Sequence, residues 1–146
     1  MNSHTTSSVE HSRIIELERH RHPNGSLTVF ENGAAGCPFD VRRVFYLYDV
    51  PADARRGGHS HHEACELIVA LSGSFDVVLD DGKQPPRRYS LNRPYRALYI
   101  PAGLWRTLDN FSGGAVCMVL TSHRYSEADY VRDYDKFKQL ANGIKI

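Results

Sequence analysis

Residues 56–82, RGGHSHHEACELIVALSGSFDVVLDDG, contain two short apolar runs that are each followed by turn-forming residues. The runs, 66–70 and 75–79, have the length and the branched and aromatic side chains of β-strands. Ser72-Gly73-Ser74 separates them, and Asp80-Asp81-Gly82 has the composition of a hairpin turn. The stretch therefore predicts alternating strands and tight turns.

The same pattern extends in both directions along the chain. Further strands are predicted at 14–17, 27–30, 41–50, 89–91, 97–100, 107–111 and 116–122. Short strands with turns every 8–12 residues are typical of an antiparallel sandwich or barrel of the jelly-roll kind. We expect an all-β fold in which 13–146 form a single domain and 1–12 a disordered tail.

Only the C-terminal region has the periodicity of a helix. Ser126 is placed to cap it, with Asp129 three residues later. Apolar and aromatic side chains then recur at steps of three and four, at Tyr130, Val131, Tyr134, Phe137 and Leu140. One C-terminal α-helix is therefore predicted.

Composition narrows the function. Eighteen Lys and Arg against seventeen Asp and Glu leave a net charge of +1, which argues against binding to nucleic acid or to an anionic membrane. The apolar runs are far shorter than the roughly 20 residues that span a bilayer. Three cysteines without a CxxC pair predict neither a disulfide framework nor a zinc site, and favour a reduced, cytoplasmic setting.

The histidines are unevenly distributed, since three of the eight, His59, His61 and His62, lie within four residues. On a strand, His59 and His61 face the same side. Glu66 follows after four residues and Gly73 after six more. This spacing resembles the first sequence motif of the cupin family, whose fold is a jelly-roll barrel.

Many cupins hold a divalent metal with two His and one Glu of this motif and a fourth His from a second motif. The matching stretch here begins at Pro101 and carries Arg106 in place of that His. A guanidinium has no lone pair for a metal and adds a fixed positive charge. We therefore expect no metal. The alternative is a metal-dependent enzyme of the dioxygenase kind, with His59, His61 and Glu66 as a facial triad.

A narrower resemblance covers most of the chain, from residue 25 to 138. The element RGGHSH (56–61), the element LYIPAGLWR (98–106) and the tail DYVRDYDKF (129–137) resemble the dTDP-sugar 3,4-ketoisomerases, which are metal-free cupins of the WxcM-like group typified by FdtA and QdtA. The resemblance implies an isomerase that moves the carbonyl of dTDP-4-keto-6-deoxyglucose from C4 to C3 in deoxysugar biosynthesis, without a cofactor. It also implies a homodimer that exchanges N-terminal strands, and it assigns the two catalytic histidines to His59 and His61.

The chemistry requires a base that removes the proton α to the carbonyl, and an imidazole is suited to this at neutral pH. We assign the proton transfer to His61, with His59 orienting the sugar or sharing the transfer. The enediolate needs fixed hydrogen-bond donors. The candidates are Arg43, Tyr46, Tyr48 and Arg106. Because alternation separates Tyr46 and Tyr48 from Arg43, Tyr46 is ranked first.

The remaining candidates concern the rest of the substrate. Arg56 and Arg132 are assigned to the diphosphate, and Trp105 either stacks on a ring or packs in the core.

Glu66 orients a histidine or binds metal. A third hypothesis is a sugar-nucleotide-binding cupin without catalysis.

Overall fold

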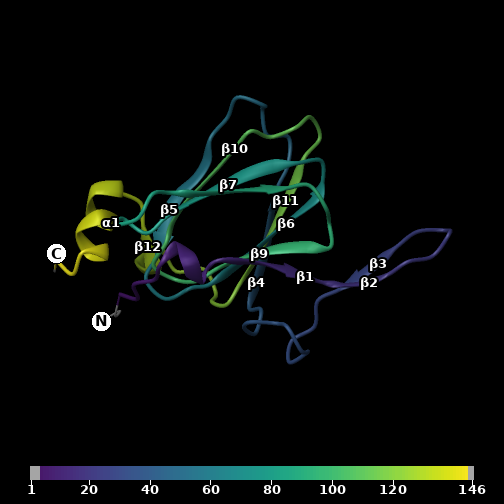
Figure 1. Ribbon diagram of the computed structural model, residues 1–146, viewed down its shortest axis with the longest axis horizontal. Helices are drawn as coiled ribbons and strands as arrows, with labels where there is room; N and C mark the ends of the chain where they lie inside the picture. Colours follow the sequence, from purple (N-terminus) through teal and green to yellow (C-terminus); the bar gives the residue numbers. More distant parts are fainter. Residues whose placement is uncertain (1–3, 145–146) are drawn as a thin grey trace.

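The computed structural model describes residues 4–144 and folds them into two five-stranded antiparallel sheets that face each other (Figure 1). The first sheet has the order β1 (Arg13–Glu16), β9 (Arg96–Ile100), β6 (Glu66–Ser72), β11 (Val116–Thr121), β4 (Arg43–Leu47). The second has the order β12 (Tyr130–Val131), β5 (Arg56–His61), β10 (Trp105–Asp109), β7 (Phe75–Asp80), β8 (Arg87–Leu91). The prediction of an all-β fold with one C-terminal α-helix is confirmed.

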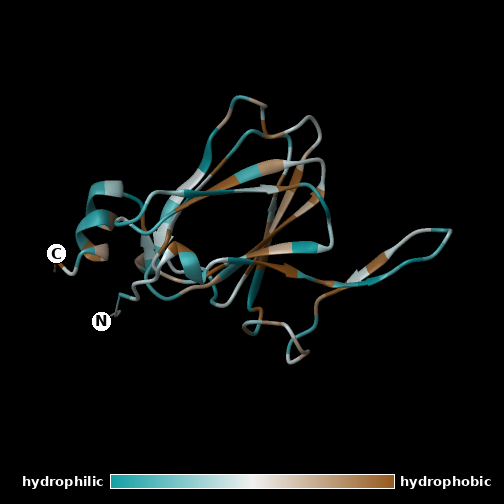
Figure 2. Cartoon of the chain, in the orientation of Figure 1, coloured by the Kyte–Doolittle hydropathy of each residue, from teal (hydrophilic) through white to brown (hydrophobic). Residues whose placement is uncertain are grey.

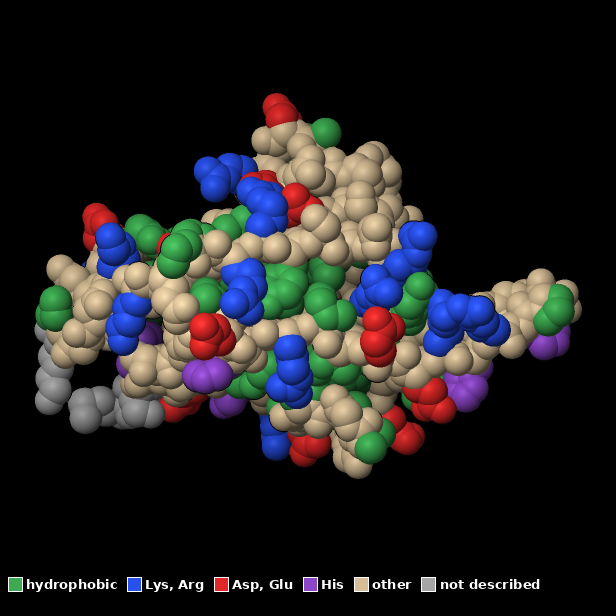
Figure 3. All heavy atoms as spheres, in the orientation of Figure 1, with side chains coloured by type: hydrophobic (Ala, Val, Ile, Leu, Met, Phe, Trp, Pro, Cys, Tyr) green, Lys and Arg blue, Asp and Glu red, His purple; other side chains and the backbone are tan. Residues whose placement is uncertain are grey.

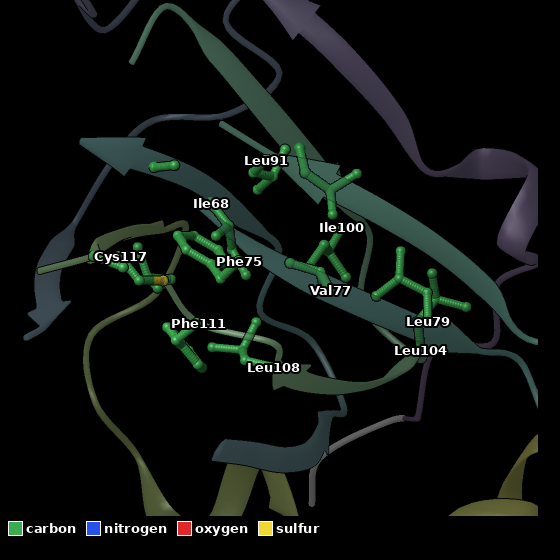
Figure 4. Close-up of a cluster of buried hydrophobic side chains, with 14 of the residues drawn as sticks. Ile68, Phe75, Val77, Leu79, Leu91, Ile100, Leu104, Leu108, Phe111 and Cys117 are labelled. Carbon is green, nitrogen blue, oxygen red and sulfur yellow. The ribbon is translucent and has the colours of Figure 1, made fainter. Parts of the chain in front are cut away.

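The space between the sheets is filled by alternate residues of the strands. On β7, Phe75, Val77 and Leu79 are buried and point inward, as the two-residue period of a strand requires. They meet side chains such as Leu108 of β10 and Cys117 of β11 (Figure 4). Strands of the two sheets are accordingly rich in hydrophobic residues in Figure 2. The hydrophobic core does not fill the whole interior, and polar side chains line one end of the barrel.

A hairpin arm, β2 (Glu18–His20) with β3 (Leu27–Val29), projects away from the barrel (Figure 1). It carries basic and histidine side chains, visible at the right of Figure 3. The chain on either side of the arm, together with 39–41, packs on the outer face of the first sheet, where Leu67, Val69 and Leu120 form a second buried cluster.

The C-terminal segment differs from the prediction. It forms a 3₁₀ turn η2 (Glu127–Asp129), then β12, and only then α1 (Tyr134–Ala141). Asp133 caps α1 by accepting a hydrogen bond from the Lys136 N–H, whereas the Ser126 side chain makes no capping bond. The predicted helix start at Ser126 is wrong because residues 130–131 pair with β5, and a strand needs extended backbone.

Residues 4–12 were expected to form part of a disordered tail, but they pack against the barrel. Val9, in the 3₁₀ turn η1 (Val9–His11), is 2% exposed and belongs to the main core. The Thr5 N–H donates to the His62 carbonyl, and the Val9 N–H donates to the Asp81 carboxylate. An apolar anchor and two backbone hydrogen bonds are sufficient to order a segment that composition alone marked as mobile. Residues 1–3 lie outside the described residues.

Among the helices that the structure describes, none is long and apolar enough to span a membrane.

Candidate active site

Two imidazoles lie side by side between the sheets. His59 and His61 are two residues apart on β5, so both project into the barrel, and both are buried. Their ring centroids are 4.8 Å apart and the rings are almost perpendicular. Within residues 4–144, Nε2 of each ring is buried without a hydrogen-bond partner. Two polar atoms in this state indicate a place for a ligand, because buried polar atoms are otherwise almost always paired.

Opposite the histidines lies a buried ion pair. Glu66 at the start of β6 receives hydrogen bonds from Nε and Nη2 of Arg106 on β10, the latter at 3.0 Å. Both side chains are buried, and Nε2 of His61 lies 3.7 Å from Oε2 of Glu66. A bidentate pair of this kind fixes the positions of both groups. Glu66 and Arg106 therefore form the rigid wall beside the two imidazoles.

Gly57 makes room for the guanidinium. Its φ is +68°, and a Cβ atom placed on it would lie 2.3 Å from Nη1 of Arg106. The Gly57 carbonyl also accepts a hydrogen bond from that nitrogen at 3.4 Å. The glycine before the histidines is thus required both by the backbone conformation and by the approach of Arg106.

The C-terminal segment closes the site from the side of β5. The Tyr130 ring lies 4.8 Å from His59 and 4.4 Å from His61, centroid to centroid. Its hydroxyl accepts a hydrogen bond from Nη1 of Arg43, at 3.2 Å. Asp129, in η2, lies 3.1 Å from Nδ1 of His61 through its Oδ2. Each of the two histidines therefore has a different set of polar neighbours.

These neighbours separate the basicities of the histidines. Burial and the nearby Arg106 lower the pKa of His59 to about 2, so this imidazole is neutral. Burial also acts to lower the pKa of His61, but Asp129 and Glu66 outweigh it and raise that pKa above its ordinary value. Burial acts to raise the pKa of Glu66, yet Arg106 and His61 hold it well below its usual range. His61 is therefore the stronger base of the pair.

The residues do not suit a divalent metal. Ligand atoms of His59, His61 and Glu66 lie within 4.8 Å of one another, as in a cupin metal centre. Both oxygens of Glu66, however, already accept from Arg106, whose fixed charge would repel a cation at this position. Arg106 also stands at the sequence position of the fourth ligand of metal-binding cupins, so we derive no step through a metal.

The structure brings only part of the predicted set together. His59, His61, Glu66 and Arg106 meet inside the barrel, and Arg43 reaches them through Tyr130. Tyr46 and Tyr48 instead project from the outer face of β4, 60% and 62% exposed. The ranking of Tyr46 over Arg43 is thus reversed, because the face of β4 that carries Phe45 and Leu47 packs against the core.

Three predicted substrate contacts lie outside the barrel or at its edge. Arg56, at the exposed start of β5, lines an open hollow of about 320 Å³ with Tyr46 and Tyr48. Trp105 packs against α1, with its ring centroid 5.7 Å from that of Phe137, and so is a packing residue. Arg132 precedes α1, pairs with Glu127 at 2.7 Å and lies over the Tyr130 ring.

Sequence reasoning missed Asp129 and Tyr130. Both were assigned to a helix, Asp129 as part of its cap and Tyr130 as packing. The motif DYVRDYDKF did contain them, but nothing in the spacing of residues 129–137 indicates contact with a strand about 70 residues earlier.

Comparisons with known proteins agree with this geometry. Residues 10–142 match the family model of FdtA, described as "WxcM-like, C-terminal". The TDP-4-oxo-6-deoxy-alpha-D-glucose-3,4-oxoisomerase of Aneurinibacillus thermoaerophilus is 35% identical over 135 residues, which cover 92% of this chain and 96% of that protein.

Solved structures give the same result. A 3,4-ketoisomerase from Helicobacter canadensis superimposes with a TM-score of 0.86 at 37% identity, over 90% of this chain and 98% of that one. A mutant of the 3,4-ketoisomerase QdtA from Thermoanaerobacterium thermosaccharolyticum, in complex with TDP-4-keto-6-deoxyglucose, has a TM-score of 0.87 at 32% identity, over 92% and 96% of the two chains. The match over nearly the whole length confirms the cupin-type jelly roll and the resemblance seen in the sequence. The chain belongs to the FdtA family of WxcM-like sugar isomerases.

Proposed function

We propose that this protein is a 3,4-ketoisomerase of TDP-4-keto-6-deoxyglucose. The observation that carries the proposal is the pair of inward-facing imidazoles, of which His61 is held basic and His59 neutral. The names of the related isomerases supply the substrate. A proton shift between neighbouring carbons needs one strong base and fixed donors, and both are present in this site.

His61 takes the proton from C3, which is acidic because C4 is a ketone. The electrons of the broken C–H bond form the C3–C4 double bond of an enediolate, and the carbonyl oxygen O4 receives the negative charge. His61 then returns a proton to C4, while the hydroxyl proton of O3 leaves and C3 becomes the ketone. Atoms and electrons balance without an external oxidant, because one carbon is reduced as its neighbour is oxidised.

We assign the neutral His59 to the two sugar oxygens, O3 and O4. Its Nε2 is buried without a partner among residues 4–144, and a neutral imidazole can polarise a carbonyl by hydrogen bonding, as in triosephosphate isomerase. We assign to it the transfer of the proton from O3 to O4. Arg43, Tyr130 and the Glu66–Arg106 pair form the polar wall that orients the sugar, so Arg43 replaces Tyr46 in our assignment.

The nucleotide is assigned to the rim of the barrel. Arg132 lies near His59 at the open end and Arg56 begins the strand that carries both histidines. Arginine is suited to a diphosphate because its planar fork matches phosphate oxygens. Tyr46 and Tyr48 lie beside Arg56 in the hollow of about 320 Å³. We propose this rim, rather than the buried pocket, for the charged half of the substrate.

The test is incubation with TDP-4-keto-6-deoxyglucose in D₂O, with EDTA present, followed by NMR of the sugar carbons. We expect the carbonyl to move from C4 to C3 and deuterium to enter at these carbons. His61→Asn should lower kcat by about 10²–10⁴-fold, whereas His11→Asn, at an exposed position of η1, should not. Turnover that stops with EDTA and returns with a metal would contradict the proposal, as would binding without turnover.

We also propose a homodimer that forms through the N-terminal arms. The arm exposes Leu27. A hollow of about 280 Å³ lies between the arm and the first sheet and is lined by side chains such as Phe30, Leu71 and Met118. Exposed apolar surface of this kind is typical of subunit contacts.

A reducing compartment, the cytoplasm, is proposed from the cysteines. Cys37, Cys65 and Cys117 are all free thiols. Burial raises the pKa of Cys117 to about 12, so this thiol is inert. Titration of three free thiols in the purified protein, after unfolding in the absence of a reductant, checks this proposal.

A further inference from the structure

Asp129 lies beside Nδ1 of His61, one of the two nitrogens of the imidazole. We propose that Asp129 is a positioning residue that holds the proton on Nδ1 of His61 and so leaves the Nε2 lone pair free to take the substrate proton. The inference rests on the proposed function, in which His61 is the base. Asp129 contacts the Nδ1 edge of the ring, opposite the Nε2 edge.

Backbone hydrogen bonds hold the carboxylate of Asp129 in place, independently of its contact with the imidazole. Its Oδ1 accepts from the Glu63 N–H at 2.8 Å, and its Oδ2 accepts from the Ala64 N–H at 3.2 Å. The His62 N–H donates to the Asp129 carbonyl at 2.9 Å. These bonds join η2 to the turn that follows β5. The position of the carboxylate relative to His61 is therefore set by backbone groups rather than by a free rotamer.

The tautomer of His61 follows from the chemistry of this contact. An ionised carboxylate only accepts hydrogen bonds, and the same N–H donors, together with His61, keep the pKa of Asp129 below its usual value although burial acts to raise it. Nδ1 of His61, 3.1 Å from Oδ2, must then be the donor. A neutral imidazole carries one proton, so Nε2 is left as the acceptor.

Nε2 makes no hydrogen bond of its own. Oε2 of Glu66 lies 3.7 Å from it, which is beyond hydrogen-bond distance, and already accepts from Arg106. In the residues that the structure describes, Nε2 is buried without a partner. The imidazole thus has one nitrogen held by Asp129, and one without a hydrogen-bond partner in the described residues.

Other charged and titratable groups surround the ring. Glu66 on β6 and Arg106 on β10 form a neutralised pair, and His59 on β5 is neutral. Tyr130 on β12 lies against the ring at a tilt of 58° and accepts a hydrogen bond from Arg43 on β4. Asp129 is the charged group that contacts Nδ1. Its charge also stabilises the imidazolium that forms after proton transfer, which makes His61 a stronger base.

Asp129→Asn tests the assignment, because an amide N–H2 directed at Nδ1 favours the opposite tautomer, with the proton on Nε2. We expect kcat to fall by about 10²–10⁴-fold. We also expect the acid limb of kcat/KM to move to lower pH by about 1–3 units, since the charge beside His61 is lost. Asp133→Asn is the matched control. Asp133 caps α1 and is not among the residues that contact either histidine, and Asn caps helices as well as Asp does.

A direct measurement on the unaltered enzyme keeps the test independent of folding. In ¹⁵N spectra of the histidine side chains, neutral His61 should be the Nδ1–H tautomer in the wild type, and the Nε2–H tautomer in Asp129→Asn. An Nε2–H tautomer in the wild type would overturn the inference. So would a loss of kcat in Asp129→Asn with unchanged tautomer, pKa and pH profile, which is the result of a merely structural role.

The two proposals fail separately. If the wild type does not turn over TDP-4-keto-6-deoxyglucose, the proposed function fails while the tautomer measurement still stands. If turnover is present and the tautomer is Nε2–H, the function stands and the role of Asp129 fails.

Discussion

His59 and His61 lie on one strand, with rings 4.8 Å apart, yet they differ in basicity. The difference arises from their neighbours. Arg106 and burial disfavour a charge on His59, whereas Asp129 and Glu66 favour one on His61 in spite of its burial. The proposed mechanism assigns the two roles of the isomerisation, a base and a neutral donor, on the strength of this difference.

The pH dependence of activity follows from this difference. His61 must be neutral in the free enzyme to act as the base, and the protonated form predominates below its pKa. Because that pKa is raised, kcat/KM should increase with pH along a limb whose midpoint lies above the ordinary histidine value of 6.5. His59, with a pKa of about 2, contributes no limb in the accessible range.

The measurement is kcat/KM between pH 5 and 9, with return to neutral pH after each incubation to show that the enzyme is intact. A midpoint at or below about 6.5 would contradict the assignment of His61 as the base.

Gly57 provides a second test at a single residue. Gly57→Ala would strain a backbone with φ +68° and place a Cβ atom against Nη1 of Arg106. We expect a loss of about 1–3 kcal/mol in the free energy of unfolding, and lower activity because Arg106 is displaced. Gly58→Ala is the control, since its Cβ would meet only ordinary contacts, at 3.6 Å from Trp105 and 3.7 Å from Thr107.

Urea denaturation and kcat of the two variants give the comparison. Equal effects of Gly57→Ala and Gly58→Ala would show that the approach of Arg106 does not determine the residue at position 57.

At the level of single residues, local sequence spacing predicted those site residues that lie close together in the sequence. The positions of His59, His61 and Glu66 follow from strand alternation and one turn, and these three do converge. Asp129 was beyond such reasoning, because it reaches His61 through a contact between residues 68 positions apart.

For whole strands, alternation separates two faces but does not decide which one is inside. On β4, Arg43, Phe45 and Leu47 share one face, and Val44 and Tyr46 share the other. Both faces mix apolar with polar groups, so composition cannot rank them. β4 lies at one edge of its sheet, and its pairing with β11 sets the face that is turned inward.

The C-terminal helix shows that a helical sequence pattern does not by itself decide where the helix begins. The three- and four-residue steps from Tyr130 onward are real, but pairing of 130–131 with β5 overrides them and delays the helix to Tyr134. Asp133, rather than Ser126, is then the N-cap.

Replacement of the two caps tests this boundary. Asp133→Ala removes the acceptor for the Lys136 N–H and should lower the free energy of unfolding by about 1 kcal/mol. Ser126→Ala should change it by less than about 0.5 kcal/mol, because the Ser126 side chain makes no capping bond. Thermal and urea unfolding of both variants measure the difference, and the reverse order of effects would place the helix start at Ser126.

For the molecule as a whole, the site lies at one end of the barrel and the arm extends from the other (Figure 1). The N-terminal segment passes the site end, where Thr5 bonds to His62, before the chain runs through β1 to the arm. The general fold was predictable from turns and strand lengths. The strand at 27–30 was predicted too, but its pairing with 18–20 in an arm outside the barrel was not, because strand patterns do not show which strands pair.

The arm gives the last prediction. If two copies assemble through their arms, light scattering should give twice the 16.5 kDa of one chain. Leu27→Asp should weaken the dimer, since Leu27 is 61% exposed in the single chain and would be covered by the partner. Burial of one leucine contributes about 1.5–3 kcal/mol, and a two-fold axis doubles it. The dissociation constant should therefore rise by about 10²–10⁴-fold.

Asn24→Asp is the control. It adds the same charge at the turn of the arm, where Asp is tolerated, and should leave the dimer intact. A wild-type chain that remains monomeric at micromolar concentration, or equal weakening by both substitutions, would rule out the arm as the contact.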